Sequence, residues 1–136
     1  MLKYIDQEEY IELLGADSIP DDFNNLVIKA SSYINRHTFG RIDKNSIPEQ
    51  VKYATCLIIE LENKANIQKE EIGNLKSQNI EGWSESYSTP EEIDSKLKID
   101  KEDVLKEQLW DVIGKDSNYL LYRGEWLWIR NFLYIK

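Results

Sequence analysis

The sequence predicts a mainly helical fold: a small bundle of about four helices with a β-hairpin or extended arm and an extended C-terminal tail. Apolar residues recur every three or four positions in four segments, which is the spacing of one buried helical face. Residues that favour helix starts precede these segments. The length fits one domain, which we place over 1–136, with its helical core at about 4–72 and 100–114.

Two helices are predicted in the N-terminal part of the chain. The first lies between Asp6 and Gly15, since Asp6 can cap it, Glu9 occupies the capping-box position and Gly15 can end it. The second is expected to start at about 19–22, where a proline suits the first turn and two aspartates favour the positive end of the macrodipole. Gly40 ends it. Its predicted apolar face consists of Phe23, Leu26, Val27, Ala30, Ile34 and His37.

A third helix is expected to begin at 46–49, where a serine, a proline and a glutamate repeat the start signal. From Glu60 onward its sequence is polar, so we expect it to project beyond the core before Gly73. A fourth helix is predicted after Asp100 and ends at Gly114. The start signal at 89–92 predicts only a short, weak helix.

The two remaining segments are the candidate interaction surfaces. Residues 74–88 lack helical periodicity and predict an arm that turns near Gly82. Residues 119–136 are rich in aromatic and branched side chains, which favour a strand. This tail either completes the chain's own core or docks on a neighbouring subunit or partner. The candidate interface residues are Leu75, Ile80, Trp83, Tyr87, Tyr122, Trp126, Trp128, Phe132 and Tyr134.

The charge and hydropathy of the chain argue against several partners. The formal net charge is −8 and the pI is near 4.7, so the surface should repel nucleic-acid phosphates and anionic membranes. No apolar run approaches the roughly 20 residues that span a bilayer. The N-terminus turns acidic too soon for a signal peptide, which predicts a protein that is cytosolic when made.

The residue types needed for catalysis are sparse. His37 is the only histidine and Cys56 the only cysteine, and the six glycines are scattered, so no phosphate-binding loop is formed. We expect His37 to pack or cap, and Cys56 to be a small buried hydrophobe. The sequence therefore predicts no enzyme activity, no cofactor and no metal.

Five stretches carry a resemblance to a known family. They are 10–23, 30–42 (ASSYINRHTFGRI), 47–56 (IPEQVKYATC), 76–87 (KSQNIEGWSESY) and 120–124 (LLYRG). In this order they resemble the head–tail connector, or head-completion adaptor, proteins of tailed bacteriophages and prophages. The second is similar to that family's A-S-x-x-I-D-x-x-T-x-x-R-I stretch, and the last to its L-L-Y-R-G motif. The fourth resembles its I-K-S-E-x-I-G-x-x-S-V-S-Y arm, from which Glu85 departs.

The resemblance implies a structural subunit of the virion that reaches the head–tail interface from the host cytoplasm. Its implied partners are the portal protein, neighbouring copies in a ring that is usually dodecameric, and a tail or stopper protein. DNA would pass through the ring without sequence-specific binding, and no membrane is involved. The resemblance gives no role to the twelve residues after Gly124.

Three other classes remain open. The first is a tail-completion protein or another phage or prophage interaction module of similar size. The second is a helical nucleic-acid regulator, which needs basic residues concentrated on one helix. Here the arginines, at positions 36, 41, 123 and 130, are dispersed. A small enzyme is the least supported class.

Overall fold

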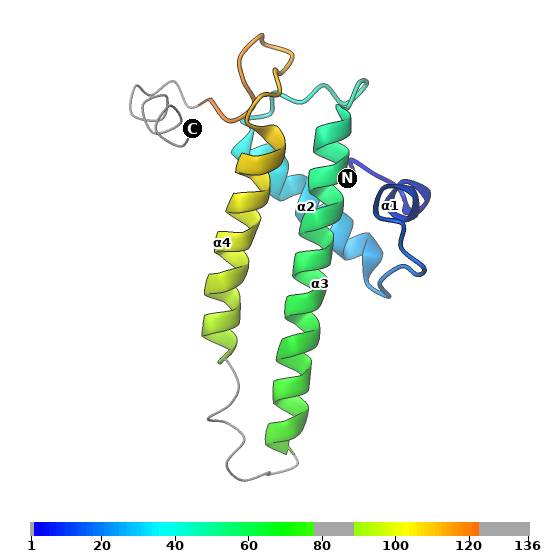
Figure 1. Cartoon of the computed structure of the whole chain (residues 1–136), viewed down its shortest axis with the longest axis vertical. Coiled ribbons are helices and arrows are strands. Elements are labelled where there is room, and N and C mark those ends of the chain that lie inside the picture. The colour runs from blue at the N-terminus through cyan, green and yellow to red at the C-terminus, as the bar shows by residue number, and fades with distance from the viewer. Residues whose placement is uncertain (1, 78–88, 123–136) are drawn as a thin grey trace.

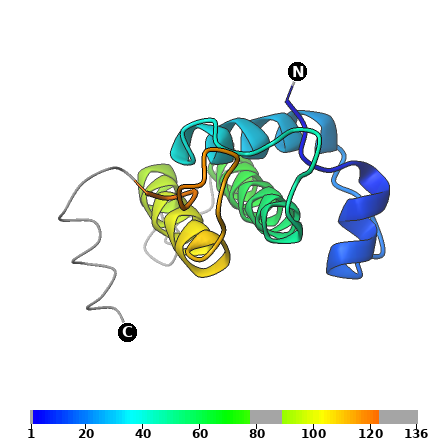
Figure 2. The same cartoon turned by 90° about the horizontal axis from the view of Figure 1, so that it is seen from above.

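The computed structural model describes residues 2–77 and 89–122, and the side chains of residues 2–73 and 89–122. Its helices are α1 (Gln7–Leu14), α2 (Phe23–His37), α3 (Glu49–Ser77) and α4 (Pro90–Leu109). Helices α3 and α4 form a long antiparallel pair, α2 crosses this pair near one end, and α1 lies to one side of α3 (Figure 1). The view from above shows α2 lying across one face of the pair (Figure 2). The predicted mainly helical class is confirmed.

Helix α1 forms where its caps predict it. The Glu9 N–H donates to the Asp6 side chain at 2.8 Å, and the Asp6 N–H donates to the Glu9 carboxylate at 3.2 Å, which completes a capping box. Gly15 ends the helix in the left-handed conformation with φ 65°. Tyr10 anchors the helix to α2 through an edge-on contact with Phe23, with ring centroids 5.3 Å apart.

Helix α2 begins at Phe23, slightly later than the predicted 19–22. The Phe23 N–H donates to the Pro20 carbonyl at 3.0 Å, so the proline and the two aspartates form a turn before the helix. It ends at His37, slightly before the predicted Gly40. The Thr38 hydroxyl donates to the Ile34 carbonyl at 2.8 Å, and residues 39 and 40 both have left-handed backbones.

Helix α3 is longer than predicted. It begins at Glu49 and continues through Gly73 to Ser77, a length of about 43 Å for its 29 residues. Residues 74–77, which we assigned to the arm, are therefore helical. One glycine costs a helix only about 1 kcal/mol, and contacts with α4 support this end. We call these contacts the distal seam; it consists of Ala65, Ile72, Ile93 and Leu97.

Helix α4 begins eleven residues before the predicted start. Thr89 caps it by accepting a hydrogen bond from the Glu92 N–H at 3.2 Å, and Pro90 lies in the first turn. Asp100 is thus not a cap but a mid-helix residue that pairs with Lys96 at 3.1 Å. The helix ends at Leu109, so the predicted helix end at Gly114 is wrong: residues 110–114 belong to a loop.

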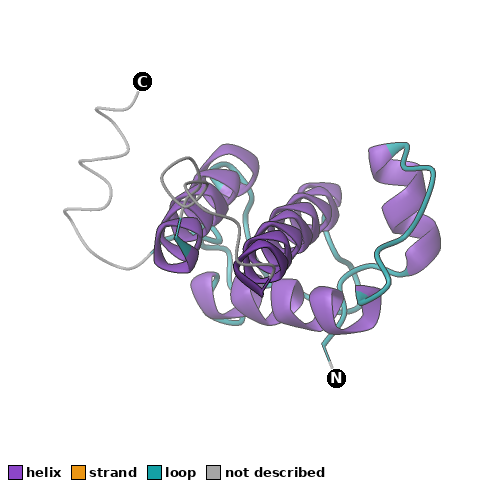
Figure 3. Cartoon of the chain, turned by 90° about the horizontal axis from the view of Figure 1, so that it is seen from below, coloured by secondary structure: helices purple, strands orange, loops and turns teal. Residues whose placement is uncertain are grey.

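The main core lies where α1 and α2 meet the adjoining halves of α3 and α4. Seen from below, α2 lies across the α3–α4 pair (Figure 3). Cys56 is fully buried there, which confirms its predicted packing role, and burial raises the pKa of its thiol to about 12. His37 is half-buried, with Nδ1 2.8 Å from the Tyr33 carbonyl oxygen and its ring stacked 4.1 Å from the Tyr33 ring. The packing role predicted for this histidine is also observed.

Candidate interaction surface

Two loops that are distant in sequence meet at the end of the molecule where α4 ends (Figure 1). One is the turn at 38–42, which follows α2, and the other is the loop 110–122, which follows α4. The second loop closes on itself, because the Leu120 N–H donates to the Val112 carbonyl and the Gly114 N–H donates to the Asn118 carbonyl, both at 2.8 Å. An isolated antiparallel bridge joins residues 113 and 119. The fully buried Leu120 side chain attaches this loop to the main core.

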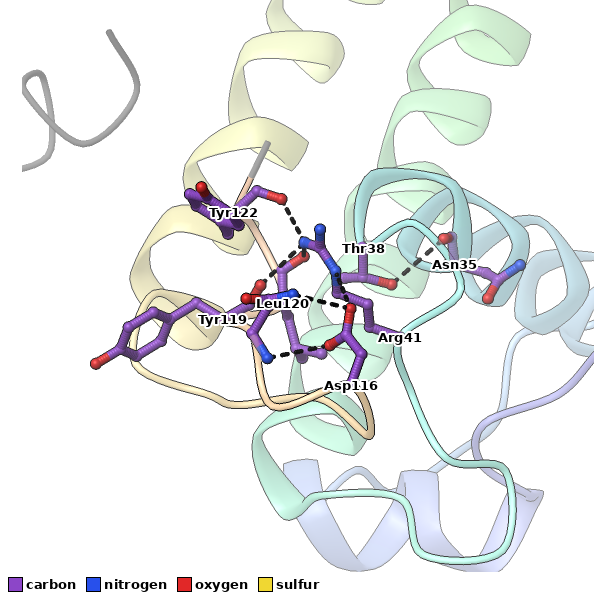
Figure 4. Close-up of polar contacts among 8 residues, drawn as sticks. Asn35, Thr38, Arg41, Asp116, Tyr119, Leu120 and Tyr122 are labelled. Atoms are coloured by element: carbon purple, nitrogen blue, oxygen red, sulfur yellow. Dashed lines mark hydrogen bonds and ion pairs between the residues drawn. The ribbon is translucent and has the colours of Figure 1, made fainter. Parts of the chain in front are cut away.

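Arg41 joins the two loops. Its guanidinium donates to the Asp116 carboxylate at 3.0 Å and to the carbonyl oxygens of Tyr119, at 3.0 Å, and Leu120, at 3.3 Å (Figure 4). It also donates to the Tyr122 carbonyl. In return, the Arg41 carbonyl accepts a hydrogen bond from the backbone N–H of residue 115 at 2.9 Å. We call this set of contacts the Arg41 junction. Arginine suits it because the guanidinium is a planar group with five donors.

The junction depends on a glycine at position 114. A β-carbon built on Gly114 would lie 2.7 Å from the Arg41 Cβ, 2.8 Å from its carbonyl oxygen and 3.0 Å from Leu120 Cδ2. These distances are too short for a side chain other than hydrogen. Gly114 therefore permits the close approach of the two loops. The sequence analysis predicted a helix end at this glycine, and that prediction is wrong.

Asp116 is held in its ionised form at this junction. Partial desolvation would raise the pKa of its carboxyl group, but hydrogen bonds from Asn118 and the Arg41 guanidinium outweigh that cost and lower the pKa. The carboxylate lies at the surface, with its side chain 42% exposed. Its function in the fold is to accept hydrogen bonds from both loops.

A second charged cluster ties α2, α3 and α4 together beneath the junction. The buried Glu62 of α3 accepts from Lys101 of α4 at 2.7 Å and from Lys29 of α2 at 3.4 Å. Burial raises the pKa of Glu62, and the two lysines more than compensate, so the pKa is lowered. The Lys101 ammonium also lies 4.5 Å from the centroid of the Tyr33 ring. The charged groups of this cluster are thus paired with one another, and their role is to hold the three helices together.

The loops at this end expose large apolar side chains. We call these four side chains the end patch. They are Phe39 (54% exposed), Trp110 (44%), Ile113 (57%) and Tyr119 (48%). Phe39 has a φ of 56°, a left-handed conformation that bulky residues seldom adopt. The Arg41 guanidinium lies 4.9 Å from the Phe39 ring centroid and 5.8 Å from that of Tyr122. The sequence analysis missed this surface, although the glycines at positions 40 and 114 mark both of its loops.

The predicted interface residues have different outcomes. Tyr122 lies at the Arg41 junction, and the backbone of Leu75 belongs to α3. The other predicted interface residues lie outside the described part of the chain: Ile80, Trp83 and Tyr87 of the arm, and Trp126, Trp128, Phe132 and Tyr134 of the tail. The first residues of the predicted tail, 119–122, are a bridge residue followed by a turn.

One segment near the N-terminus carries acids without compensating basic residues. Residues 4–28, which include α1, contain seven acids and no lysine or arginine. Across this region Lys52 of α3 pairs with Glu9 at 2.6 Å, and Lys3 donates to Asn24 at 2.6 Å. An open groove of about 840 Å³ runs beside α1, and both lysines and acids line it. This mixed lining favours no single class of ligand.

No group of three or more His, Cys, Asp or Glu side chains in residues 2–73 and 89–122 is placed to hold a metal ion. None of the helices given above is both long and apolar enough to cross a bilayer. Comparisons with family models, curated proteins and solved structures find no match to this chain.

Proposed function

We propose that this chain is a structural subunit of a tailed phage or prophage, a head–tail connector that forms a ring beneath the portal protein. Neighbouring copies, the portal and a tail or stopper protein are its proposed partners, and twelve copies per ring is the proposed stoichiometry. In this proposal the ring extends the DNA channel and makes no sequence-specific contact with DNA. The subunit works by fitting against proteins in the virion and has no catalytic role.

The observation that carries the proposal is the Arg41 junction. Two of the stretches that resemble the connector family, 30–42 and 120–124, lie almost 80 residues apart in sequence. Arg41 of the first donates to the carbonyls of Leu120 and Tyr122 of the second. Residues that carry the resemblance therefore form one structural unit, which supports reading them as parts of one ancestral motif.

The shape of the chain also supports the proposal. The α3–α4 pair is long, and among the described residues its far half is joined by the narrow distal seam and by an ion pair between Lys69 and Asp94. Both sides of the pair are therefore available for lateral contacts between subunits. We propose that residues 78–88 form the hairpin arm predicted above and pack on an adjacent subunit through Ile80, Trp83 and Tyr87. Trp126, Trp128 and Tyr134 of the tail are proposed to dock on a partner.

Particle assembly tests the proposal. A phage or prophage that encodes this chain should fail to join heads to tails when the gene is deleted, and DNA-filled heads should accumulate. Restoring the full chain should restore joining, whereas a chain lacking residues 125–136 should not. A Lys98→Ala chain, altered at one exposed position of α4, is the matched control and should restore joining fully.

The outcomes separate the proposal from its main alternative. A tail-completion protein would co-sediment with purified tails, and its loss would leave defective tails. A connector would co-sediment with portal-bearing heads and leave tails intact. Normal joining by the truncated chain would remove the proposed docking role of the tail but keep the connector assignment.

A further inference from the structure

The two loops that carry the end patch are joined to each other. The Arg41 junction fixes loop 110–122 against turn 38–42, and Gly114 lets their backbones touch. The left-handed backbone at Phe39 costs about 1–3 kcal/mol, so the fold stabilises an unfavourable conformation that leaves this ring about half exposed. Soluble monomers seldom leave several large apolar side chains together in water. The patch is therefore expected to be covered.

The segment that begins beside the patch has the composition to cover it. Eight of the 14 residues in 123–136 are apolar or aromatic: Trp126, Leu127, Trp128, Ile129, Phe132, Leu133, Tyr134 and Ile135. The segment holds three basic residues and one acid, a net charge of +2, while residues 1–122 hold 14 basic residues and 24 acids, a net charge of −10. The apolar side chains of this segment thus match the apolar end patch, and its positive charge is opposite to the negative charge of residues 1–122.

Connectivity favours the same molecule over a second copy. The carbonyl of Tyr122 accepts a hydrogen bond from Arg41, so residue 123 follows directly from the junction. Fourteen extended residues reach about 46 Å, far enough to cross the patch. A segment tethered at such a short range has an effective concentration in the millimolar range, well above the micromolar concentration of other copies in a dilute solution.

We infer that in the free chain residues 123–136 dock on the end patch of the same molecule, with apolar side chains against Phe39, Trp110, Ile113 and Tyr119. The inference concerns the free chain and goes beyond the proposed function, because it can hold whether or not the chain forms a ring. If the tail also docks on a partner, it must first leave this patch.

Disulfide trapping in the full-length chain tests the inference. Asp111, exposed next to Trp110, is changed to Cys together with Asn131 of the tail. Mild oxidation should then link the pair within one molecule. Cys56 should not compete, because it is fully buried and its thiol pKa is about 12. Product size on a non-reducing gel and the count of free thiols by mass spectrometry identify the link.

A distant pair serves as the first control. Glu92 is exposed in the first turn of α4, about 27 Å along the helix from Trp110, and is paired with the same Asn131→Cys. The patch pair should oxidise at least about tenfold faster than this distant pair, since docking adds to the local concentration that the tether already gives at the patch. Equal rates for the two pairs would overturn the inference.

Changes to the patch provide the second control. Ile113→Ser with Tyr119→Ser should lower the rate of the patch pair to that of the distant pair. Ile67→Ser with Ile99→Ser, at exposed apolar positions elsewhere (46% and 58% exposed), should leave it unchanged. Circular dichroism checks that each variant keeps its helices. An unchanged rate in the first variant, or disulfide-linked dimers as the main product, would contradict docking within one molecule.

Discussion

Gly114 lies so close to Arg41 that a β-carbon at position 114 would be 2.7 Å from the Arg41 Cβ. The two residues are 73 positions apart, and their contact joins the end of α2 to the loop that follows α4. The contact leaves no room for adjustment by a flexible side-chain end, because the Arg41 carbonyl oxygen would lie 2.8 Å away as well. The Arg41 junction is thus a point where backbone packs on backbone.

The first prediction concerns this glycine. Gly114→Ala should destabilise the fold by about 1–3 kcal/mol, because an added methyl group must displace backbone in a packed site. Thermal and urea unfolding measure the loss. Gly73→Ala is the matched control: a β-carbon there meets nothing within 4 Å, so alanine in α3 should stabilise by about 0.5–1 kcal/mol. Equal effects of the two changes would refute the role assigned to Gly114.

The second prediction concerns the guanidinium. Arg41→Lys should lower the free energy of unfolding by about 2 kcal/mol, because a single ammonium cannot serve Asp116 and three carbonyl oxygens together. The side chain is only 14% exposed, so water replaces these contacts poorly. Hydrogen exchange should accelerate first in residues 110–122. If exchange accelerated only along with global unfolding, the junction would not be a distinct element.

The third prediction concerns Glu62 and pH. Its carboxyl pKa is lowered in the folded chain, so the ionised form contributes stability above the ordinary carboxyl pKa of 4.5, and this contribution is lost as pH falls through the folded value. Glu62→Gln should cost about 2 kcal/mol at pH 7, because Lys101 then lacks its carboxylate partner.

Denaturant unfolding at several pH values checks this dependence. The gap between the native chain and Glu62→Gln should be constant from pH 7 to about pH 5 and shrink below pH 4.5. Glu70→Gln, an exposed change farther along α3, should show no comparable gap. A gap that stayed constant down to pH 3 would show that Glu62 is not stabilised as a carboxylate.

The fourth prediction separates the two helix starts proposed for α4. Thr89→Ala should destabilise by about 1 kcal/mol, since its hydroxyl caps the Glu92 N–H. Asp100→Ala should cost much less, because Asp100 is a mid-helix residue whose ion pair is with the exposed Lys96 of its own helix. Helicity and unfolding midpoints give the comparison. A larger effect at position 100 would favour the later start.

The local parts of the fold could be predicted from sequence because their causes are local. Asp6, Glu9 and Gly15 define the two ends of α1 through contacts between residues three to five positions apart. Such short-range contacts can be predicted from the residue types and their spacing. The sequence predicts too late a start for α4 because the apolar stripe of its first half, Ile93 and Leu97, is narrow. A helix that projects from the core shows little apolar periodicity, although its cap at Thr89 was visible.

The candidate site was less accessible to sequence reasoning. Aromatic composition pointed to the C-terminal tail, and Tyr122 does lie at the Arg41 junction. The end patch depends instead on how turn 38–42 meets loop 110–122, a contact between distant segments. No local sequence pattern indicates that a glycine is needed at position 114 beside Arg41. Local sequence alone therefore predicts a helix end at this glycine.

The most direct test of the central claim is electron microscopy of portal-bearing heads after incubation with the full chain. The account predicts a closed ring of copies beneath the portal, coaxial with the DNA channel, and no such ring on tails. Heads that stay bare while the chain binds tails, or binds neither, would contradict it.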